Sequence, residues 1–242
     1  MIQETPAHIG MIMDGNGRWA QRHGLPRHVG HKEGAEAVRR TVRAAGERGV
    51  EYLSLFGFSA ENWRRPDEEV GELMRLLRLY LRAETASLHK NNVRVRIIGQ
   101  RDEFASDICR LMQHAEDLTQ ANTGLNLNIA LNYGGRQDIL YAARAVTRDH
   151  AAGLIGDDAL STDFFRSYLL TGHLPDIDLL IRTSGELRLS NFMLWHSAYA
   201  ELYFTETCWP DFGEAALDAA LQEYARRQRR FGGLDTETRH GS

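Results

Sequence analysis

The sequence predicts an α/β protein with a single central, mainly parallel β-sheet that is flanked by helices. The first observation is a set of short apolar runs of strand length: "HIGMIM", "YLSLFGF", "VRVRIIG", "LNLNIALNY" and "DIDLLIR". The second is that the longer segments between them repeat apolar residues at intervals of three and four, the period of a helix. Strands that alternate with helices in this way are typical of parallel sheets covered on both faces.

The third observation is that nothing in the sequence divides the chain. Its 242 residues contain no internal repeat, low-complexity segment or Pro/Ser-rich linker. Single α/β domains of this size are common. We therefore expect one domain over residues 1–233, followed by a flexible polar tail over residues 234–242.

The first half of the chain contains two predicted strands, each followed by a helix start. The strand at 8–13 precedes the turn and helix start "GNGRWAQRHG", and a longer helix is expected from His31 to residue 49. After the strand at 52–58, Pro66 suits the first turn of a helix, and the acidic residues after it favour the helix dipole. The apolar stripe of this helix either packs on the core or lines an apolar binding cavity; its members are Val70, Leu73, Met74, Leu77, Tyr80 and Leu81.

The second half continues the alternation. Strands are expected at 93–99, 125–133 and 176–182, and helices over "GGRQDILYAARAVTRDHAAG" and "DFGEAALDAALQEYARRQRR". The last of these helices ends in a basic cluster, which complements the carbonyl end of a helix.

The composition limits the partners and the compartment. A formal net charge of −4 argues against an electrostatic nucleic-acid binder. Cys109 and Cys208 match no metal-binding or redox spacing, so we expect free thiols in a reducing compartment and a cytoplasmic location. No charged-then-apolar signal precedes His8, and no run of about 18 apolar residues occurs. These features predict a soluble protein that can still contact a membrane surface.

The first chemical cluster follows the first strand. Asp14 ends the apolar run and precedes two glycines, Gly15 and Gly17, which let the backbone approach a ligand closely. Asn16 and Arg18 can donate to phosphate oxygens. An aspartate among such donors fits a magnesium ligand, because Mg²⁺ is commonly held by one or two carboxylates together with substrate phosphates. A simple helix cap is the alternative role for this aspartate.

Two further groups of polar residues lie near strand ends. Arg27 and His31 occur together in "RHVGH", where the histidine is either structural or part of the site. The segment "FSAENWRRP" leaves the second strand and carries Ser59, Asn62 and Arg65. Trp63 beside them is either a packing or a stacking residue.

The last cluster, "LLIRTSGELRLSN", begins where the fifth strand ends. Arg182, Arg188 and Ser190 can grip a doubly charged diphosphate, because guanidinium groups match phosphate geometry and a hydroxyl adds a donor. Three strand ends thus supply anion-binding groups, whereas only one supplies an obvious metal ligand. Two diphosphates that share one active site would explain this distribution.

Taken together, five ordered motifs resemble the cis-prenyltransferase family over His8 to Gly233. They are "HIGMIMDGNGRWA", "GFSAENWRRP", "LNLNIALNYGGRQDI", "IRTSGELRLSNFMLWHSAYAELYF" and "WPDF". The resemblance implies the cis-prenyltransferase fold in a homodimer. It also implies a magnesium-dependent enzyme that adds isopentenyl diphosphate to an allylic diphosphate such as farnesyl diphosphate. The expected product is undecaprenyl diphosphate, the precursor of a lipid carrier for cell-wall synthesis, whose release allows contact with the inner leaflet of the membrane.

The resemblance also implies roles for individual residues. Asp14 is the essential carboxylate that acts with Mg²⁺ as diphosphate departs, and Asn62 assists proton removal. Glu201 is linked to metal binding. Arg230 and Gly232 reach the isopentenyl diphosphate site of the partner subunit. The remaining substrate-binding positions are Gly15, Asn16, Gly17, Arg18, Trp19, Arg27 and His31 for the allylic diphosphate; Ser59, Glu61, Trp63 and Arg65 around Asn62; and Arg182, Arg188 and Ser190 for isopentenyl diphosphate.

Some positions depart from the family pattern or correspond to positions linked to the length of the product. Leu125 matches a position linked to the cavity floor, with plain core packing as the alternative. Gly57 replaces a common alanine beside the expected cavity and leaves a shorter-chain synthase as an alternative. Ser184 and His196 replace a common glycine and glutamine, and both replacements are expected to be tolerated.

Three alternative functions do not match the residues of this sequence. A phosphohydrolase with an aspartate nucleophile would require that residue where Ile12 stands. The two Asp-Asp-x-x-Asp clusters of a trans-type prenyltransferase are absent from the sequence. A noncatalytic binding subunit of the same family would lack the aspartate and donors that are present here.

Overall fold

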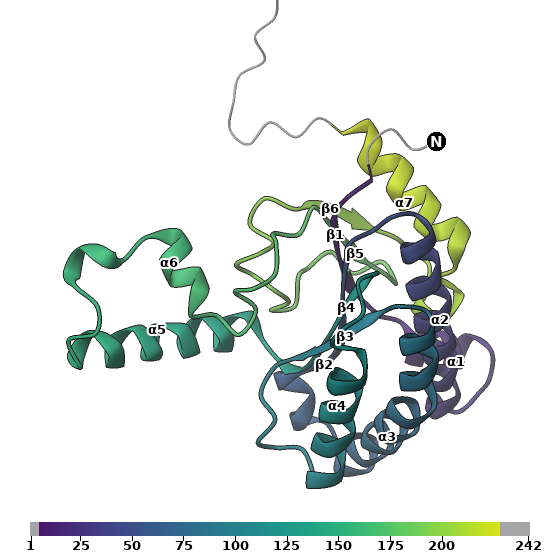
Figure 1. Cartoon of the computed structure of the whole chain (residues 1–242). Helices are drawn as coiled ribbons and strands as arrows, with labels where there is room; N and C mark the ends of the chain where they lie inside the picture. The colour runs from purple at the N-terminus through teal and green to yellow at the C-terminus, as the bar shows by residue number, and fades with distance from the viewer. Residues whose placement is uncertain (1–4, 228–242) are drawn as a thin grey trace, which may run out of the picture.

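The computed structural model describes residues 5–227 and builds them around one six-stranded, all-parallel sheet (Figure 1). The strand order is β3-β4-β2-β1-β5-β6. This confirms the single parallel sheet and all five predicted strands. The strands are β1 (His8–Ile12), β2 (Tyr52–Ser59), β3 (Arg94–Ile98), β4 (Asn126–Tyr133), β5 (Leu179–Arg182) and β6 (Glu201–Phe204).

The predicted helices are present, with changes at their ends and some additions. The second helix begins at Arg27 rather than His31, because Pro26 stands at its N-cap in an extended conformation. Strand β6 and helices α4 and α6 were not predicted as separate elements. The helices are α1 (Asn16–Arg22), α2 (Arg27–Glu47), α3 (Asp67–Lys90), α4 (Ser106–Thr119), α5 (Gly135–Ala151), α6 (Thr162–Ser167) and α7 (Glu214–Arg226), with short 3₁₀ turns η1 (Ala60–Arg64), η2 (Asp157–Ala159) and η3 (Trp209–Asp211).

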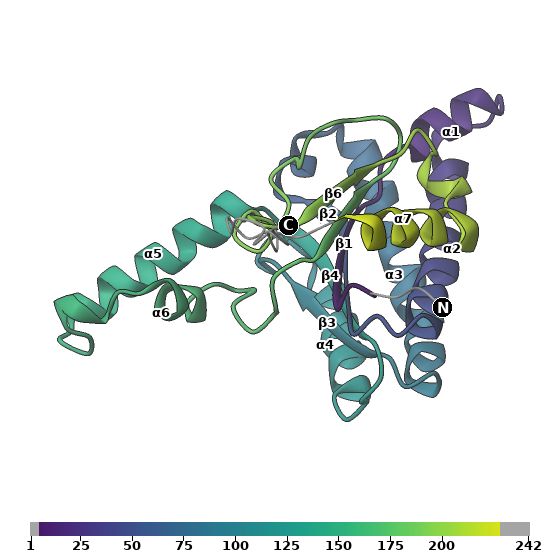
Figure 2. The same ribbon diagram turned by 90° about the horizontal axis from the view of Figure 1, so that it is seen from above.

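Most helices cover one face of the sheet. Alternate strand residues such as Met11, Leu55 and Leu127 point to this face and are almost fully buried. They pack against α2 and α7, while α3 and α4 close a second apolar cluster over β3 and β4. Figure 2 shows α2, α3 and α7 along this side. Each such side chain contributes about 1.5–3 kcal/mol through burial, so this face supplies much of the core.

The other face is covered largely by coil. Ile12, Ala130 and Leu180 point to this side and pack against residues of the segment 174–193, including Ile177 and Phe192. The prediction of helices flanking the sheet therefore holds, but the layers are unequal. The coil can approach closely here because Gly10 has no side chain: a Cβ atom at this position would lie 2.8 Å from Ile177 Cδ1.

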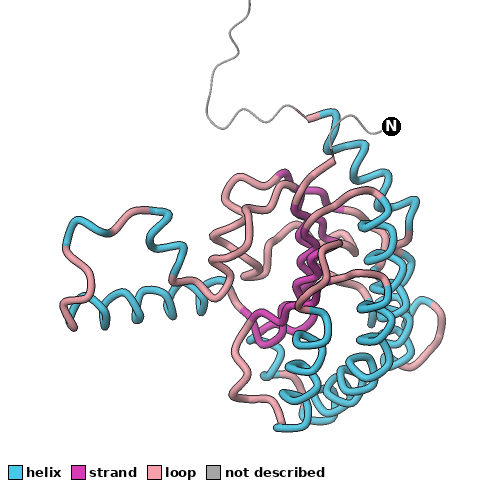
Figure 3. Tube along the Cα trace, in the orientation of Figure 1, coloured by secondary structure: helices cyan, strands magenta, loops and turns pink. Residues whose placement is uncertain are grey.

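Helices α5 and α6 extend away from the sheet (Figures 1 and 2), and Figure 3 shows loops in the segment between them, which also contains the short turn η2. The base of α5 is fixed by Asp138, whose carboxylate accepts hydrogen bonds from the Tyr133 hydroxyl (3.0 Å) and the Thr171 hydroxyl (2.7 Å). Farther along α5, Leu140 and Tyr141 are exposed.

The strand order determines where the predicted site forms. Strands β2, β1 and β5 are neighbours and run in the same direction. Their carboxyl ends, which carry the three polar motifs, therefore meet at one edge of the sheet. Ligands of open α/β sheets bind at this edge. Among residues 5–227, no helix is long and apolar enough to cross a membrane.

Candidate active site

Asp14 stands at the centre of this edge, two residues beyond the end of β1. Its Oδ2 atom lies 2.9 Å from Arg182 Nη2 and 3.1 Å from Arg18 Nη2. Partial burial alone would raise the pKa of Asp14, but the hydrogen bonds from Arg182 and Arg18 outweigh it and hold the pKa below its ordinary value. The side chain is therefore an ionised carboxylate at neutral pH. It does not cap α1, whose N-cap is Gly15.

Gly15 makes the close turn that sets this arrangement. Its φ is +106°, a conformation that favours glycine. A Cβ atom here would lie 2.6 Å from Ser184 Oγ. Ser184 itself has φ +76°, which explains why a glycine is common at this position in the family that the sequence resembles. The segment that contains Gly15 and the segment that contains Ser184 thus touch directly beside Asp14.

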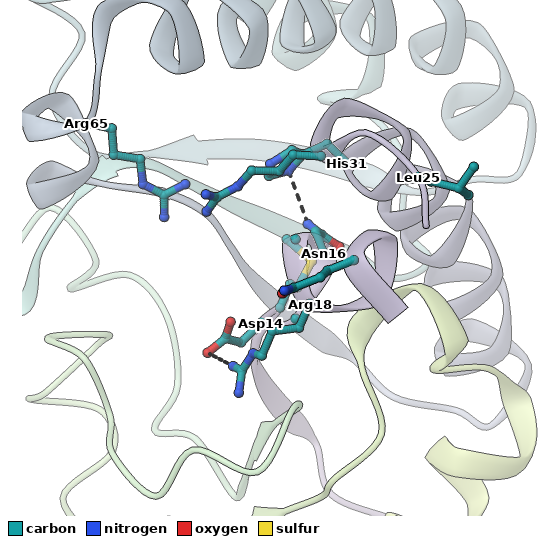
Figure 4. Close-up of a pocket in the computed structure, with 11 residues that line it drawn as sticks. Asp14, Asn16, Arg18, Leu25, His31 and Arg65 are labelled. Atoms are coloured by element: carbon teal, nitrogen blue, oxygen red, sulfur yellow. Dashed lines mark hydrogen bonds and ion pairs between the residues drawn. The ribbon is translucent and has the colours of Figure 1, made fainter. Parts of the chain in front are cut away.

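A pocket of about 470 Å³ opens on the helix side of Asp14 (Figure 4). The donors around it come from separate elements: Asn16 from α1, Arg27 and His31 from α2, and Arg65 from the end of η1. We call these four residues the pocket group. The pocket is lined by Met13, Asp14, Gly15, Asn16, Gly17, Arg18, Gln21, Leu25, Arg27, His31 and Arg65.

His31 is the most buried titratable member of the pocket group. Its Nδ1 atom lies 3.4 Å from Asn16 Nδ2 (Figure 4). Burial, followed by the nearby charges of Arg27 and Arg65, lowers the pKa of His31, so the ring is neutral at pH 7. Neither His31 Nε2 nor Asn16 Oδ1 has a hydrogen-bond partner within residues 5–227. Buried polar atoms usually have partners, so the unpaired Nε2 atom of His31 marks a place where a ligand can supply one. Asn16 Oδ1 instead faces Gly34, where a Cβ atom would lie 2.4 Å away.

Glu69 organises the arginines of the pocket group. Its Oε1 atom lies 2.8 Å from Arg65 Nη1 and 3.4 Å from Arg27 Nη2. From the sequence, Glu69 is one of the acidic residues after Pro66 that favour the helix dipole, and no contact with an arginine is predicted. The i,i+4 spacing of Arg65 and Glu69 is the signal that would have indicated the first contact, whereas the contact with Arg27 requires the fold.

A second set of donors lies on the opposite side of Asp14, where β5 ends. Arg182 donates from Nη1 to the Arg188 carbonyl oxygen and to Ser190 Oγ, both at 2.6 Å. Its side chain is only 5% exposed, and its Nε atom has no partner among the described residues. Arg188 points outward, is 59% exposed and pairs with Glu186 at 2.5 Å. We call Arg182, Arg188 and Ser190 the β5 group.

Arg18 connects the two sides. It contacts Asp14, lies 3.2 Å from Glu186 Oε1, and donates to the Ser184 carbonyl oxygen at 2.8 Å. The predicted residues Gly15, Gly17, Arg18, Arg27, His31 and Arg65 are therefore brought together around Asp14. Those of the β5 group adjoin it.

Other predicted residues have side-chain or backbone partners outside the pocket instead. The Trp19 indole donates to Asp211 at 2.7 Å and does not line the pocket. Ser59 and Asn62 form a reciprocal capping box at the start of η1, in which Asn62 Oδ1 accepts from the Ser59 amide. Glu61 accepts a hydrogen bond from Asn191 at 2.8 Å. Their catalytic or binding roles stay predictions.

Trp63 packs within an aromatic cluster, and its role in binding substrate stays a prediction. Its ring contacts Phe58 and Phe104, with centroid separations of 4.9 and 5.4 Å. Its indole nitrogen donates to Asn132 Oδ1 at 2.9 Å. A buried aromatic cluster with a satisfied polar atom is a core feature, and the indole does not line the pocket beside Asp14.

Glu201 is not brought to Asp14 within this chain. It begins β6 and is paired in register with Leu179, the first residue of β5. Asp14 contacts Arg182, the last residue of β5, so Glu201 lies at the other end of this strand pair. Its carboxylate lies 3.1 Å from Arg227 Nη1. Residues 5–227 contain no group of three or more His, Cys, Asp or Glu side chains able to hold a metal ion. Arg230 and Gly232 lie outside the described residues.

Comparisons with known proteins agree with this geometry. Residues 12–232 match a prenyltransferase family described as "Putative undecaprenyl diphosphate synthase". An isoprenyl transferase from Brucella suis is 55% identical over 95% of this chain and 91% of its own length. A ditrans,polycis-undecaprenyl-diphosphate synthase, specific for (2E,6E)-farnesyl diphosphate, from Vibrio vulnificus is 49% identical over 95% of this chain and 92% of its own length. The crystal structure of lavandulyl diphosphate synthase from Lavandula x intermedia, in complex with dimethylallyl diphosphate, has a TM-score of 0.92 and 36% identity, covering 94% of this chain and 98% of that one.

Proposed function

The chain belongs to this prenyltransferase family and is a cis-prenyltransferase, and we propose that it extends farnesyl diphosphate with isopentenyl diphosphate to undecaprenyl diphosphate in a magnesium-dependent reaction. The Vibrio vulnificus relative supplies the choice of primer and product, since its name states both. In this proposal the product serves as the precursor of a lipid carrier for cell-wall synthesis.

One observation carries the proposal: an ionised carboxylate lies between two separate groups of anion-binding donors. The pocket group and the β5 group each offer cations or neutral donors that suit a diphosphate. A reaction that joins two diphosphate substrates requires two such groups side by side. We assign the allylic diphosphate to the pocket group and isopentenyl diphosphate to the β5 group.

The residues present suit Mg²⁺ that arrives with a diphosphate. Both arginines contact the same oxygen of Asp14, Oδ2, so the second oxygen is available to a cation. A single carboxylate is sufficient, because Mg²⁺ usually keeps several waters and takes its other ligands from substrate phosphates. Bound there, Mg²⁺ would neutralise charge that develops on the departing diphosphate.

The protein side chains then divide the work of ionising the primer. Arg27, Arg65 and the His31 Nε2 atom hold the leaving diphosphate in the pocket. Glu69 must share its two arginines with that diphosphate as the diphosphate binds. On the other side, the free Nε atom of Arg182 and the exposed guanidinium of Arg188 bind isopentenyl diphosphate. The carbon–carbon bond then forms beside Asp14 as the C–O bond to the primer's diphosphate breaks. The proton lost from the isopentenyl unit passes to an oxygen of the departed diphosphate, and Asn62 assists this transfer.

The growing chain needs apolar space, and we propose that it lies between the sheet and α3. Gly57 is exposed although it belongs to the central strand β2, and a Cβ atom there would contact Leu131 Cδ2 at 3.1 Å. Partly buried Val70, Leu73 and Leu77 of α3 pack on the neighbouring cluster. Leu125 precedes β4 at the end of the sheet far from Asp14 and is buried in the core. This position suits the floor of such a cavity.

We also propose a homodimer and contact with a membrane during product release. The extended α5–α6 region supports the first proposal, because its exposed Leu140, Tyr141 and Leu154 are apolar groups that a partner subunit would cover. The long apolar product supports the second, because it is insoluble in water. The predicted reach of Arg230 and Gly232 into the partner's site belongs to the same proposal.

The test is to incubate the purified protein with Mg²⁺, farnesyl diphosphate and radiolabelled isopentenyl diphosphate, and to size the dephosphorylated products by reversed-phase chromatography. A product of eleven isoprene units is expected. A shorter product would keep the chemistry but replace the physiological role, and would direct attention to Gly57 and Leu125. No incorporation with any allylic primer, from a folded protein, would leave only a noncatalytic binding subunit.

A further inference from the structure

We propose that Thr183 is a positioning residue that fixes the main chain of Asp14, so that the carboxylate is held in the orientation required for catalysis. The catalytic part of this inference rests on the function proposed above. Thr183 was not among the residues predicted from the sequence, and it does not line the pocket.

A single hydroxyl group satisfies both polar groups of the Asp14 backbone. Thr183 Oγ1 accepts a hydrogen bond from the Asp14 amide at 2.9 Å and donates to the Asp14 carbonyl oxygen at 2.7 Å. The side chain is buried, with Thr183 only 1% exposed. A hydroxyl is one of the few side-chain groups that can donate and accept at the same time, which makes threonine suited to this place.

Asp14 needs such support because it lies beyond the regular strand. Strand β1 ends at Ile12, so the sheet no longer supplies partners for the following backbone. The remaining contacts of this backbone are a short-range bond from the Asp14 amide to the Ile12 carbonyl oxygen (3.1 Å) and a bond from the Trp209 amide to the Asp14 carbonyl oxygen (3.0 Å). Thr183 also approaches the Ile12 carbonyl oxygen, at 3.4 Å.

Two consecutive residues of the β5 end therefore hold the two parts of Asp14. Arg182 binds the carboxylate, and Thr183 binds the main chain from which that carboxylate projects. With both fixed to the same strand, the carboxylate cannot rotate or shift independently of the β5 group. A misplacement of about 1 Å at a reacting centre can cost up to about a hundredfold in rate, so this restraint matters for catalysis.

The test compares Thr183→Val, which keeps the shape but removes the hydroxyl, with Thr183→Ser, which keeps the hydroxyl. We expect Thr183→Val to lower kcat by about thirtyfold with KM for both diphosphates changed less than about threefold, whereas Thr183→Ser keeps kcat within about threefold. The matched control is Thr41→Val. Thr41 is equally buried, lies on α2 and has no partner for its hydroxyl within the described chain, so its kcat should equal that of the wild type.

A wild-type kcat in folded Thr183→Val would overturn the proposal, as would an equal loss in Thr183→Ser. If Thr183→Val does not fold, Thr183→Cys replaces it, since a thiol has similar size and forms only weak hydrogen bonds. At least a tenfold loss of kcat is then expected, and no loss would overturn the inference.

A second readout separates this inference from the proposed function. The amide signal of Asp14, assigned in ¹⁵N-labelled protein, is followed by NMR hydrogen exchange in the wild type and in Thr183→Val. Loss of the Thr183 acceptor should speed the exchange of this amide by at least about tenfold. An unchanged exchange rate would overturn the positioning role. Inactivity of the wild type would overturn the proposed function while leaving this exchange rate able to decide the role of Thr183.

Discussion

The two sides of Asp14 are built differently. The pocket group comes from three separate elements and is held by few contacts: Arg27 is 62% exposed and touches only the carboxylate of Glu69 among its ion pairs within residues 5–227. The three residues of the β5 group lie within one short segment, residues 182–190. The side chain of Arg182 is 5% exposed and is bonded to Asp14, Ser190 and a main-chain carbonyl. The difference indicates that one side is prepared to receive a ligand, whereas the other also holds in place the carboxylate that we propose to be catalytic.

The largest expected effect removes the group that both sides share. Asp14→Ala should lower kcat by about a thousandfold, because neutralisation of the departing diphosphate is lost at the reacting centre. The rate of isopentenyl diphosphate incorporation measures this. Asp211→Asn is the matched control, since its carboxylate accepts from Trp19 outside the pocket. Near-normal turnover by Asp14→Ala would show that Asp14 is not the shared catalytic group between the pocket group and the β5 group.

The second prediction tests whether the β5 side holds Asp14. Arg182→Met should lower kcat by about a hundredfold and reduce the free energy of unfolding by about 2–3 kcal/mol, because Asp14 and Ser190 lose a buried, charged partner. Denaturant unfolding and steady-state kinetics measure the two effects. If stability is unchanged while activity falls, Arg182 serves ligand binding alone and the two sides are alike.

These first predictions concern features that the sequence indicated well. Glycine, asparagine and arginine directly after an apolar strand are local signals, and the parallel strand order brings their ends together. Side-chain partners were harder to predict. Asn62 bonds within its own turn, and Trp19 donates to the distant Asp211 outside the pocket. The periodicity of apolar residues does not indicate either partner.

Contacts between distant residues escaped sequence reasoning altogether. Thr183 meets Asp14 across 169 positions, and Glu69 meets Arg27 from another helix. Strand β6 was missed because none of its four residues is fully buried. Strand β5 is equally short, but all four of its residues are buried and belong to a longer apolar run. The separation of Glu201 from Asp14 likewise follows from register, which only the fold reveals.

The third prediction sharpens the assignment of substrates to sides. Arg188→Ala should raise KM for isopentenyl diphosphate by about tenfold, and Arg27→Ala should raise KM for the allylic primer by a similar factor. Both side chains are mainly exposed, so stability should change by less than about 0.5 kcal/mol. The two variants serve as each other's control. Reversed effects on the two KM values would show that the substrates occupy the opposite sides.

The smallest effect on catalysis is expected at His196, a histidine that lies outside both groups and affects stability at acidic pH. His196 lies under the coil-covered face, 1% exposed, and burial followed by the charge of Arg166 lowers its pKa to about 4. The unfolded chain binds a proton near pH 6.5 whereas the folded chain does not. Stability therefore falls as the pH drops from about 6.5 toward 4, and it is fully retained above this window.

His196→Gln removes this titration. The free energy of unfolding is compared between His196→Gln and the wild type at each pH. This difference should favour the variant by about 2 kcal/mol more at pH 5 than at pH 7.5. Urea unfolding at the two pH values measures this. Parallel losses in both proteins would show that His196 does not contribute to acid sensitivity.

The central claim is that Asp14 lies between two diphosphate sites of different construction. The most direct measurement is a crystal structure with Mg²⁺, isopentenyl diphosphate and a sulfur-bridged analogue of farnesyl diphosphate whose C–S bond resists ionisation. We predict the analogue's diphosphate on Arg27, His31 and Arg65, isopentenyl diphosphate on Arg182 and Arg188, and Mg²⁺ in contact with Asp14. Both diphosphates on one side, or Mg²⁺ bound away from Asp14, would contradict the account.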